Sequence, residues 1–192
     1  MKWIVIAILV FVPVYTYLNW HFRRPEPVYE PYAEARDRGT VERLLAAGYR
    51  RVTLAATRPT EPLHLSAPAH LAAAPGGLPA DLATALVVPP LLPASVAHIA
   101  AARETSAAQP YLVDFTAALT DEKEELLDAQ IYVHPGWLVL VPNFERVPGA
   151  LLVRSPETEV RLTVPAGVLP PGRYRVTLVA MHESRTWMLT VK

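Results

Sequence analysis

The sequence predicts an α+β protein with a single N-terminal transmembrane helix, short helices and a predominantly antiparallel β-sandwich at its C-terminal end. Two observations lead to this fold class. Residues Trp3–Trp20 form an uncharged apolar run that spans ~27 Å as a helix with a rise of ~1.5 Å per residue, close to the ~30 Å hydrocarbon core of a bilayer. From residue 129 onward, short segments of alternating apolar and polar residues are separated by Pro and Gly, which is typical of antiparallel strands joined by turns.

The composition excludes several classes of protein. The chain has 192 residues, of which 52% are hydrophobic and 19% are charged. Lys plus Arg and Asp plus Glu number 18 each, and this balance argues against a nucleic-acid binder, which normally carries a basic excess. The absence of cysteine excludes disulfides, thiolate metal sites and cysteine nucleophiles. The 20 prolines favour long irregular connections between short regular elements.

We expect four segments along the chain. Residues 1–24 form a membrane anchor, and residues 25–39 form a Pro-rich stalk in which PEPVYEP favours an extended polyproline II spacer. Residues 40–128 form a mixed α/β region with a long Ala/Pro-rich loop, and residues 129–192 form the portion that folds as an antiparallel β-sandwich.

The apolar run is predicted to be an uncleaved signal-anchor of a single-pass protein. The residues that follow it are bulky and aromatic rather than the small ones of a cleavage site. Pro13 favours packing against a partner helix, because a neighbouring helix can satisfy the carbonyl that the proline frees; an isolated kinked anchor is the alternative. Aromatic and basic residues near the ends of the run are expected at the membrane interface. These residues are Trp3, Tyr17, Trp20, Arg23 and Arg24.

The two signals for orientation disagree. Arg23 and Arg24 follow the apolar run, and the positive-inside rule then favours a cytoplasmic C-terminal domain. A short N-terminus, an apolar run, a Pro-rich stalk and a β-rich end form a layout that is common in bacterial proteins whose domain faces outward. We therefore expect the protein in the cell membrane with an extracytoplasmic (periplasmic) C-terminal domain.

The region after the stalk begins with a helix and a strand. Thr40–Gly48 starts with a residue suited to a helix N-cap and ends with a glycine stop, and the helical pattern extends back toward Tyr32. Tyr49–Ala56 alternates as a half-buried strand does.

Residues Arg58–Pro93 are irregular but apolar, which is unlike a disordered linker, so we expect a loop that lies on a core or on a partner. Within it, Leu63–Leu65 predicts a brief strand, and Asp81–Val87 predicts one or two helical turns capped by Asp81.

Three further elements complete this region. Pro93–Ser106 predicts a helix, because its apolar residues recur at helical spacing. Pro110–Ala117 predicts a strand. Thr120–Asp128 predicts a capped, acidic helical turn or two with a solvated face, because acidic residues crowd the first turn after a threonine.

The C-terminal segment predicts a series of short strands. A hairpin is expected where Pro135-Gly136 joins two apolar runs. The number of strands and their spacing indicate an antiparallel sandwich or barrel. The predicted strands are Gln130–His134, Trp137–Val141, Ala150–Ser155, Glu159–Val164, Arg173–Ala180 and Ser184–Val191.

The last two strands carry a resemblance to a known family. Gly172–Leu178 (GRYRVTL) and Trp187–Val191 (WMLTV) alternate around a short turn, and this pattern resembles the final hairpin of immunoglobulin-like β-sandwich domains. The sequence departs from antibody-type domains in having no cysteine pair. The resemblance implies a sandwich used for binding or scaffolding rather than for chemistry.

One group of residues suits a metal. Met181, His182 and Met188 combine thioether and imidazole ligands, which suit copper; the alternative is a loop histidine beside ordinary methionines. His64 and His70 are six residues apart across a proline, a spacing that fits neither a helical nor a strand pair of ligands. Neither a Gly-rich phosphate loop nor a Gly-x-Ser-x-Gly elbow occurs, and no catalytic residue or cofactor is predicted.

The leading functional hypothesis is a non-enzymatic accessory subunit, assembly factor or partner-binding module of a membrane complex. Its expected partners are the lipid bilayer and a membrane protein, and nucleic acid is not among them. The alternative is an envelope protein that binds copper or a small ligand. A membrane-associated enzyme is the third hypothesis.

Overall fold

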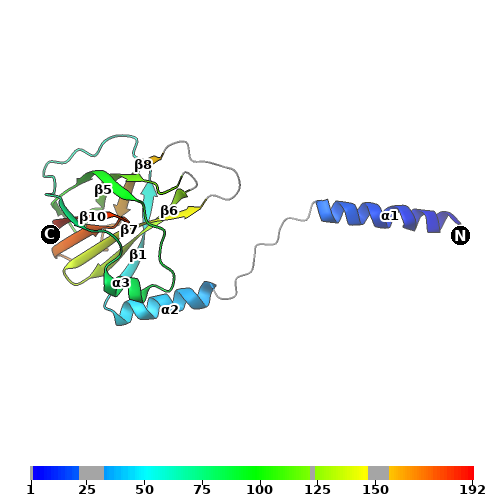
Figure 1. Cartoon of the computed structure of the whole chain (residues 1–192), viewed down its shortest axis with the longest axis horizontal. Helices are drawn as coiled ribbons and strands as arrows, with labels where there is room; N and C mark the ends of the chain where they lie inside the picture. The colour runs from blue at the N-terminus through cyan, green and yellow to red at the C-terminus, as the bar shows by residue number, and fades with distance from the viewer. Residues whose placement is uncertain (1, 22–32, 122–123, 147–155) are drawn as a thin grey trace. The chain divides into compact units, whose positions relative to one another are not determined.

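The computed structural model describes residues 2–21, 33–121, 124–146 and 156–192. The chain forms two units, residues 1–36 and 37–192. Helix α1 (Lys2–His21) belongs to the first unit, and all of the strands belong to the second (Figure 1). The other elements are α2 (Ala33–Ala46), β1 (Arg50–Thr57), β2 (Ala72–Pro75), α3 (Ala80–Ala85), β3 (Ser95–Ala101), β4 (Glu104–Thr105), β5 (Tyr111–Ala118), β6 (Glu124–His134), β7 (Trp137–Arg146), β8 (Glu157–Val164), β9 (Gly172–Leu178) and β10 (Glu183–Val191).

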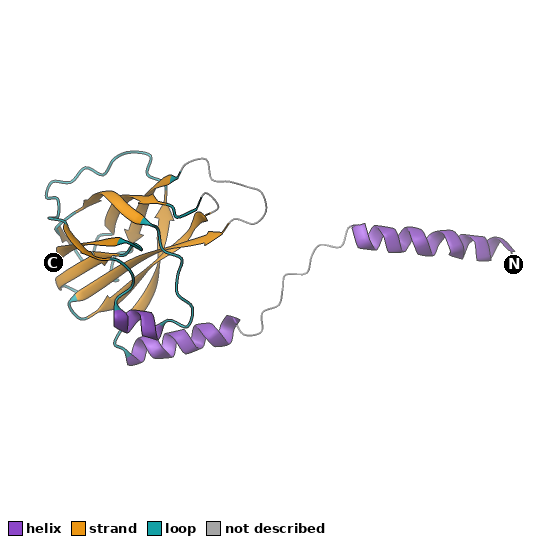
Figure 2. Ribbon diagram, viewed as in Figure 1, coloured by secondary structure: helices purple, strands orange, loops and turns teal. Residues whose placement is uncertain are grey.

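The strands close into a barrel. The order around it is β10-β3-β5-β8-β1-β6-β7-β9, and β9 pairs again with β10. The pairs β7–β9 and β10–β3 are parallel and the other neighbours in the ring are antiparallel. Figure 2 shows these strands wrapped around a common centre, with the helices of this unit at one end.

The predicted α+β fold with an immunoglobulin-like β-sandwich is therefore wrong. Alternation identifies strands with one buried face, but it does not distinguish two packed sheets from one sheet that closes on itself. Closure depends on β1, β3 and β5, which precede residue 129, so strands from both sides of that position share one barrel.

The predicted membrane-spanning segment is also wrong. Residues 2–21 are helical, as expected, but within the described ranges no helix has both the length and the apolar character needed to cross a bilayer. Helical structure does not by itself make a membrane span, because apolar character has to extend across the whole ~30 Å of hydrocarbon. The single-pass, signal-anchor topology and the cell-membrane, periplasmic location depended on this segment and are withdrawn with it.

Two predicted helices are strands in the structure. Residues predicted as the helix Pro93–Ser106 form β3 and β4. The register of β3 against β5 shifts between Ala97 and Ala100, and this bulge interrupts the strand alternation, leaving the apolar residues at helical spacing. Residues predicted as acidic turns over Thr120–Asp128 enter β6 from Glu124 onward and pair with β7, and the Glu124 side chain, predicted on a solvated face, is buried.

Other local predictions agree with the structure. The helix predicted over Thr40–Gly48 is α2, which begins at Ala33 and so includes the last seven residues of the predicted stalk. The Pro135-Gly136 turn joins β6 to β7, with Gly136 at φ 74°. The turns predicted at Asp81–Val87 form α3, although its N-cap is Pro79 rather than Asp81. Leu63–Leu65 is not a strand, and the strand predicted at Ala150–Ser155 lies outside the described residues.

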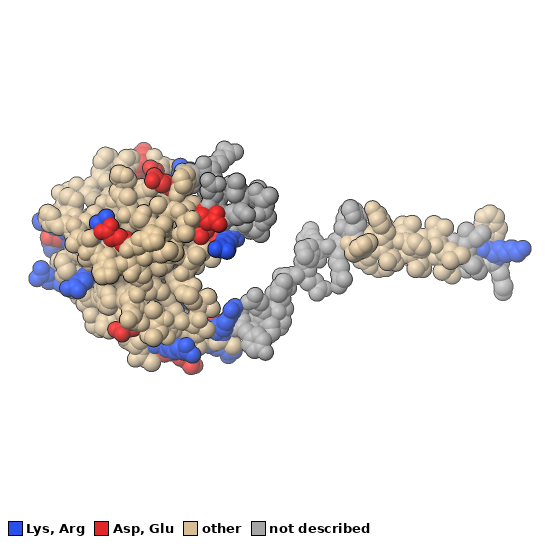
Figure 3. Space-filling view, in the orientation of Figure 1, with Lys and Arg blue, Asp and Glu red and all other residues tan. Residues whose placement is uncertain are grey.

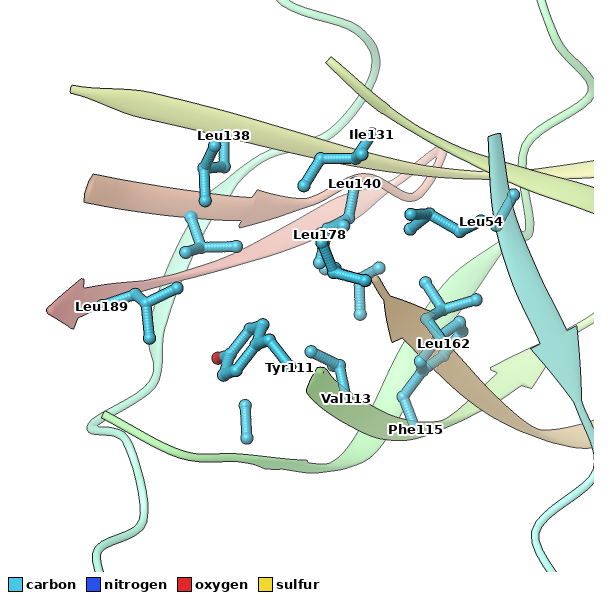
Figure 4. Packing of buried hydrophobic residues seen from close by; sticks show 14 of the residues in the cluster. Leu54, Tyr111, Val113, Phe115, Ile131, Leu138, Leu140, Leu162, Leu178 and Leu189 are labelled. Atoms are coloured by element: carbon cyan, nitrogen blue, oxygen red, sulfur yellow. The ribbon is translucent and has the colours of Figure 1, made fainter. Parts of the chain in front are cut away.

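Side chains fill the interior of the barrel. An eight-stranded barrel is just wide enough for this. Figure 4 shows Tyr111, Val113 and Phe115 of β5 pointing toward Leu138, Leu140 and Leu178 of the opposite wall. The interior is therefore a packed core rather than a ligand chamber.

A second core lies outside the barrel wall. Leu44 of α2 and Leu82 of α3 pack with Tyr132, Val139 and Val141 on the outer face of β6 and β7. The Tyr132 hydroxyl donates to the Gln130 side-chain oxygen at 2.6 Å, and burial raises the pKa of Tyr132 to about 12. This second core holds α2 and the connection between β2 and β3, which carries α3, against the barrel.

The barrel closes along a seam between β10 and β3. These strands pair directly only at Glu183 and Ser95. β10 also pairs with β2 over Glu183–Thr186 and with β4 at Thr190 and Val191. Inside the seam, the buried Trp187 indole donates to the Tyr111 hydroxyl at 2.9 Å, and this hydroxyl donates to the Ala102 carbonyl at 3.0 Å. Burial raises the pKa of Tyr111, so its hydroxyl keeps its proton.

We expect Tyr111→Phe to lower the free energy of unfolding by about 1–3 kcal/mol, because it leaves the Trp187 N–H and the Ala102 carbonyl without their partner. Chemical denaturation measures the change. Tyr174→Phe is the matched control, since the Tyr174 hydroxyl donates a single local bond to the Pro170 carbonyl. An equal loss in both variants would contradict the role of the seam.

Candidate ligand-binding groove

The outer faces of β9 and β10 carry a hollow. Tyr174, Val176 and Leu178 of β9 lie in the barrel core with Trp187 and Leu189 of β10. Because successive side chains of a strand point to opposite faces, the residues between them point outward. These outward residues include Arg175, Thr177, Thr186 and Met188.

Strand β2 and the loop after it form the wall of this hollow. β2 runs antiparallel to β10, with Thr186 opposite Ala72 and Glu183 opposite Pro75. The chain then turns at Gly77, whose φ is 85° and whose N–H donates to the Ala180 carbonyl at 2.8 Å. Gly76 lies so close to the β9–β10 turn that an added Cβ would be 2.3 Å from the Met181 carbonyl oxygen.

The resulting cavity, which we call the outer groove, has a volume of about 650 Å³. This volume falls in the range of small-molecule sites. Its apolar walls include Ala72, Ala74, Leu78 and Trp137. Its polar lining consists of His70, Arg175, Thr177 and Thr186.

Both threonine hydroxyls are already engaged. The Trp137 indole donates to the Thr177 hydroxyl at 3.1 Å, and the Thr186 hydroxyl donates to the Val176 carbonyl at 2.8 Å. The Arg175 guanidinium and the His70 imidazole have no hydrogen bond or ion pair with another described residue. They are the polar groups of the outer groove that remain available to a ligand.

A smaller hollow of about 290 Å³ adjoins the outer groove. Gly136 lines this hollow, and Trp137, Arg175 and Met188 line both hollows. Arg175 therefore lies between the two.

The structure does not bring the three residues of the predicted copper site together. Met181 and His182 lie in the turn before β10, whereas Met188 lies in the outer groove. Six residues of extended chain separate His182 from Met188, which corresponds to about 20 Å at the rise of a strand. In the described part of the chain, no cluster of three or more His, Cys, Asp or Glu is placed to hold a metal ion.

The residues predicted at a membrane interface lie at one end of the chain. Trp3, Tyr17 and Trp20 are on α1 with exposed side chains. Arg23 and Arg24 fall outside the described residues.

Sequence reasoning missed Arg175 and Trp137 as site residues. Alternation places Arg175 on the outer face of β9, so its orientation was available from the pattern. That β2 covers this face could not be predicted from the sequence. β2 is a short Ala/Pro segment with none of the β-branched or aromatic residues that mark a strand.

A further cavity of about 250 Å³ lies on another side of the barrel, next to the bulge in β3. His98 lines it with φ at 48°, a left-handed conformation that is uncommon outside glycine. Asp114 also lines this cavity. Arg161 donates to both oxygens of the Asp114 carboxylate, at 2.7 and 2.6 Å. The hydrogen bond to Asp114 raises the pKa of Arg161.

Across the face in Figure 3, acidic and basic side chains are interspersed over the unit of residues 37–192, with broad uncharged areas between them.

Comparisons of the chain with models of protein families, with curated proteins and with solved structures found no match in any of the three.

We expect Gly76→Ala to lower the free energy of unfolding by about 1–3 kcal/mol, because the new methyl group collides with backbone atoms that have to shift. Gly39→Ala is the control. Gly39 lies inside α2 with no atom within 4 Å of an added Cβ, and removing a glycine from a helix stabilises it by about 0.5–1 kcal/mol. Denaturation curves of the two variants should move in opposite directions; a stable Gly76→Ala variant would contradict the close approach.

Proposed function

We propose that the protein binds a small organic molecule with an apolar body in the outer groove. The observation that carries the proposal is the position of the cavity. The barrel interior is filled by side chains, while a cavity of about 650 Å³ with apolar and aromatic walls lies outside it. Burial of apolar surface is the main driving force for occupying such a site.

The lining favours binding over chemistry. None of the described residues that line the outer groove is Asp or Glu, so a carboxylate general base is not at hand. Both threonine hydroxyls have partners already. The groups left over, Arg175 and His70, can orient a ligand by charge and hydrogen bonds.

The tryptophans give a selective readout of binding. The chain has four tryptophans, of which Trp3 and Trp20 lie on α1, and Trp137 and Trp187 lie on β7 and β10. In a Trp3→Phe/Trp20→Phe background, intrinsic fluorescence therefore comes from Trp137, on the wall of the outer groove, and from Trp187, in the core beside it.

In this background we expect the neutral apolar dye N-phenyl-1-naphthylamine to quench tryptophan emission in a saturable titration. Ala72→Phe should weaken the binding by about tenfold, or ~1.4 kcal/mol, because it fills the cavity from β2. Ala73→Phe is the matched control, since it is the next residue of the same strand, is exposed, and does not line the outer groove. Equal binding by both variants would contradict the proposal.

A second candidate function is that of an accessory or partner-binding subunit that docks through α1. Apolar side chains of this helix are exposed, including Leu9, Val10 and Phe11. An apolar helical surface of this kind fits a complementary apolar helix of a partner protein.

The chain has a mass of 21.2 kDa, and under this second candidate we expect it to elute in a larger complex when isolated from its native cells. Val10→Asp should return it to the mass of the free chain. Val88→Asp is the control, because Val88 lies in the barrel unit and is exposed to a similar extent, 57% against 59%. Elution of the unaltered protein at the monomer mass would exclude this function.

A further inference from the structure

We infer that the ligand of the outer groove is an apolar organic carboxylate, whose anionic end binds Arg175 while its body lies along the apolar walls. This inference rests on the proposed function and specifies the chemistry of its ligand.

Arg175 stands between two apolar neighbours on the barrel surface. In the β7–β9 pair it is opposite Trp137, and in the β9–β10 pair it is opposite Met188. Adjacent strands lie about 4.8 Å apart, so the guanidinium leaves the sheet beside an indole on one side and a thioether on the other. A ligand that reaches Arg175 must therefore also contact apolar surface.

The charge of Arg175 is not compensated by the described part of the protein. Arg51, Arg161 and Arg185 each form an ion pair with an Asp or Glu within 3.1 Å. Arg175 has no such partner among the described residues. The described residues that line the two hollows beside it include no carboxylate. The site thus combines a positive charge with an absence of competing negative charge.

The guanidinium matches a carboxylate in shape as well as in charge. Its planar fork of N–H donors binds both oxygens of a carboxylate at once. A small anion such as acetate would gain only this contact, and contacts between exposed charges are weak in water. An anion with an apolar chain adds burial against Trp137, Leu78 and Ala74, so the two halves of the site select an amphipathic ligand.

The test compares two molecules that share an alkyl chain and differ in the end group, decanoate and decan-1-ol. In the Trp3→Phe/Trp20→Phe background, we expect decanoate to bind about tenfold more tightly than decan-1-ol, and acetate not to bind. Arg175→Gln should abolish the preference by weakening decanoate and leaving decan-1-ol unchanged. Arg175→Lys keeps the charge without the fork and should retain only part of the preference.

Arg173→Gln is the matched control. Arg173 lies two residues earlier on the same outer face of β9, is exposed, and lines neither hollow. It should leave both affinities unchanged, and the thermal midpoints of the Arg173 and Arg175 variants should equal that of the parent.

The outcomes separate the inference from the proposed function. Equal affinity for decanoate and decan-1-ol, or an equal loss of preference in Arg173→Gln and Arg175→Gln, overturns the inference while groove binding stands. If neither molecule nor the neutral dye binds in a way that Ala72→Phe weakens, the proposed function itself fails.

Discussion

The hydrogen bond from the Trp187 indole to the Tyr111 hydroxyl is the buried side-chain contact that joins the two sides of the barrel at its seam. β9 and β10 pair over seven residues, whereas β10 and β3 pair at one position only. Where β10 leaves β3, the link between Trp187, Tyr111 and the Ala102 carbonyl joins the two sides from within. An unpaired polar group at this depth costs more than a hydrogen bond gains, so the two sides are held to one arrangement.

The outer groove follows from the same closure. β10 contributes alternate residues to the core and to the groove: Trp187 and Leu189 point into the core, and Thr186 and Met188 line the groove. β2 pairs with β10 beside the seam, and Gly76 lets the chain turn against the Met181 carbonyl. The second core between α3 and β7 then fixes the far end of this wall. The cavity is thus bounded by elements whose positions the barrel determines.

Local alternation predicted most strands of the barrel but not its closure. Tyr174, Val176 and Leu178 identify the inner face of β9, and Pro135-Gly136 identifies the β6–β7 hairpin. β3 escaped prediction because its bulge at His98 breaks the two-residue period. The pairing of Ser95 with Glu183 joins segments far apart in the chain, and no local pattern encodes it. The candidate site was missed for the same reason, since Arg175 gains its apolar neighbours only through pairing with β7 and β10.

The sharing of β10 between core and groove couples occupancy to folding. A ligand that binds only the closed barrel adds a free energy of RT ln(1 + [L]/Kd) to its stability, about 2.7 kcal/mol when the ligand is at 100 times its Kd. Because the groove is built across β2, β9 and β10, this increment acts on the strands beside the seam, where direct pairing is sparsest. Thermodynamic linkage makes the two effects reciprocal, so under the proposed function a higher concentration of ligand lowers how often the barrel opens.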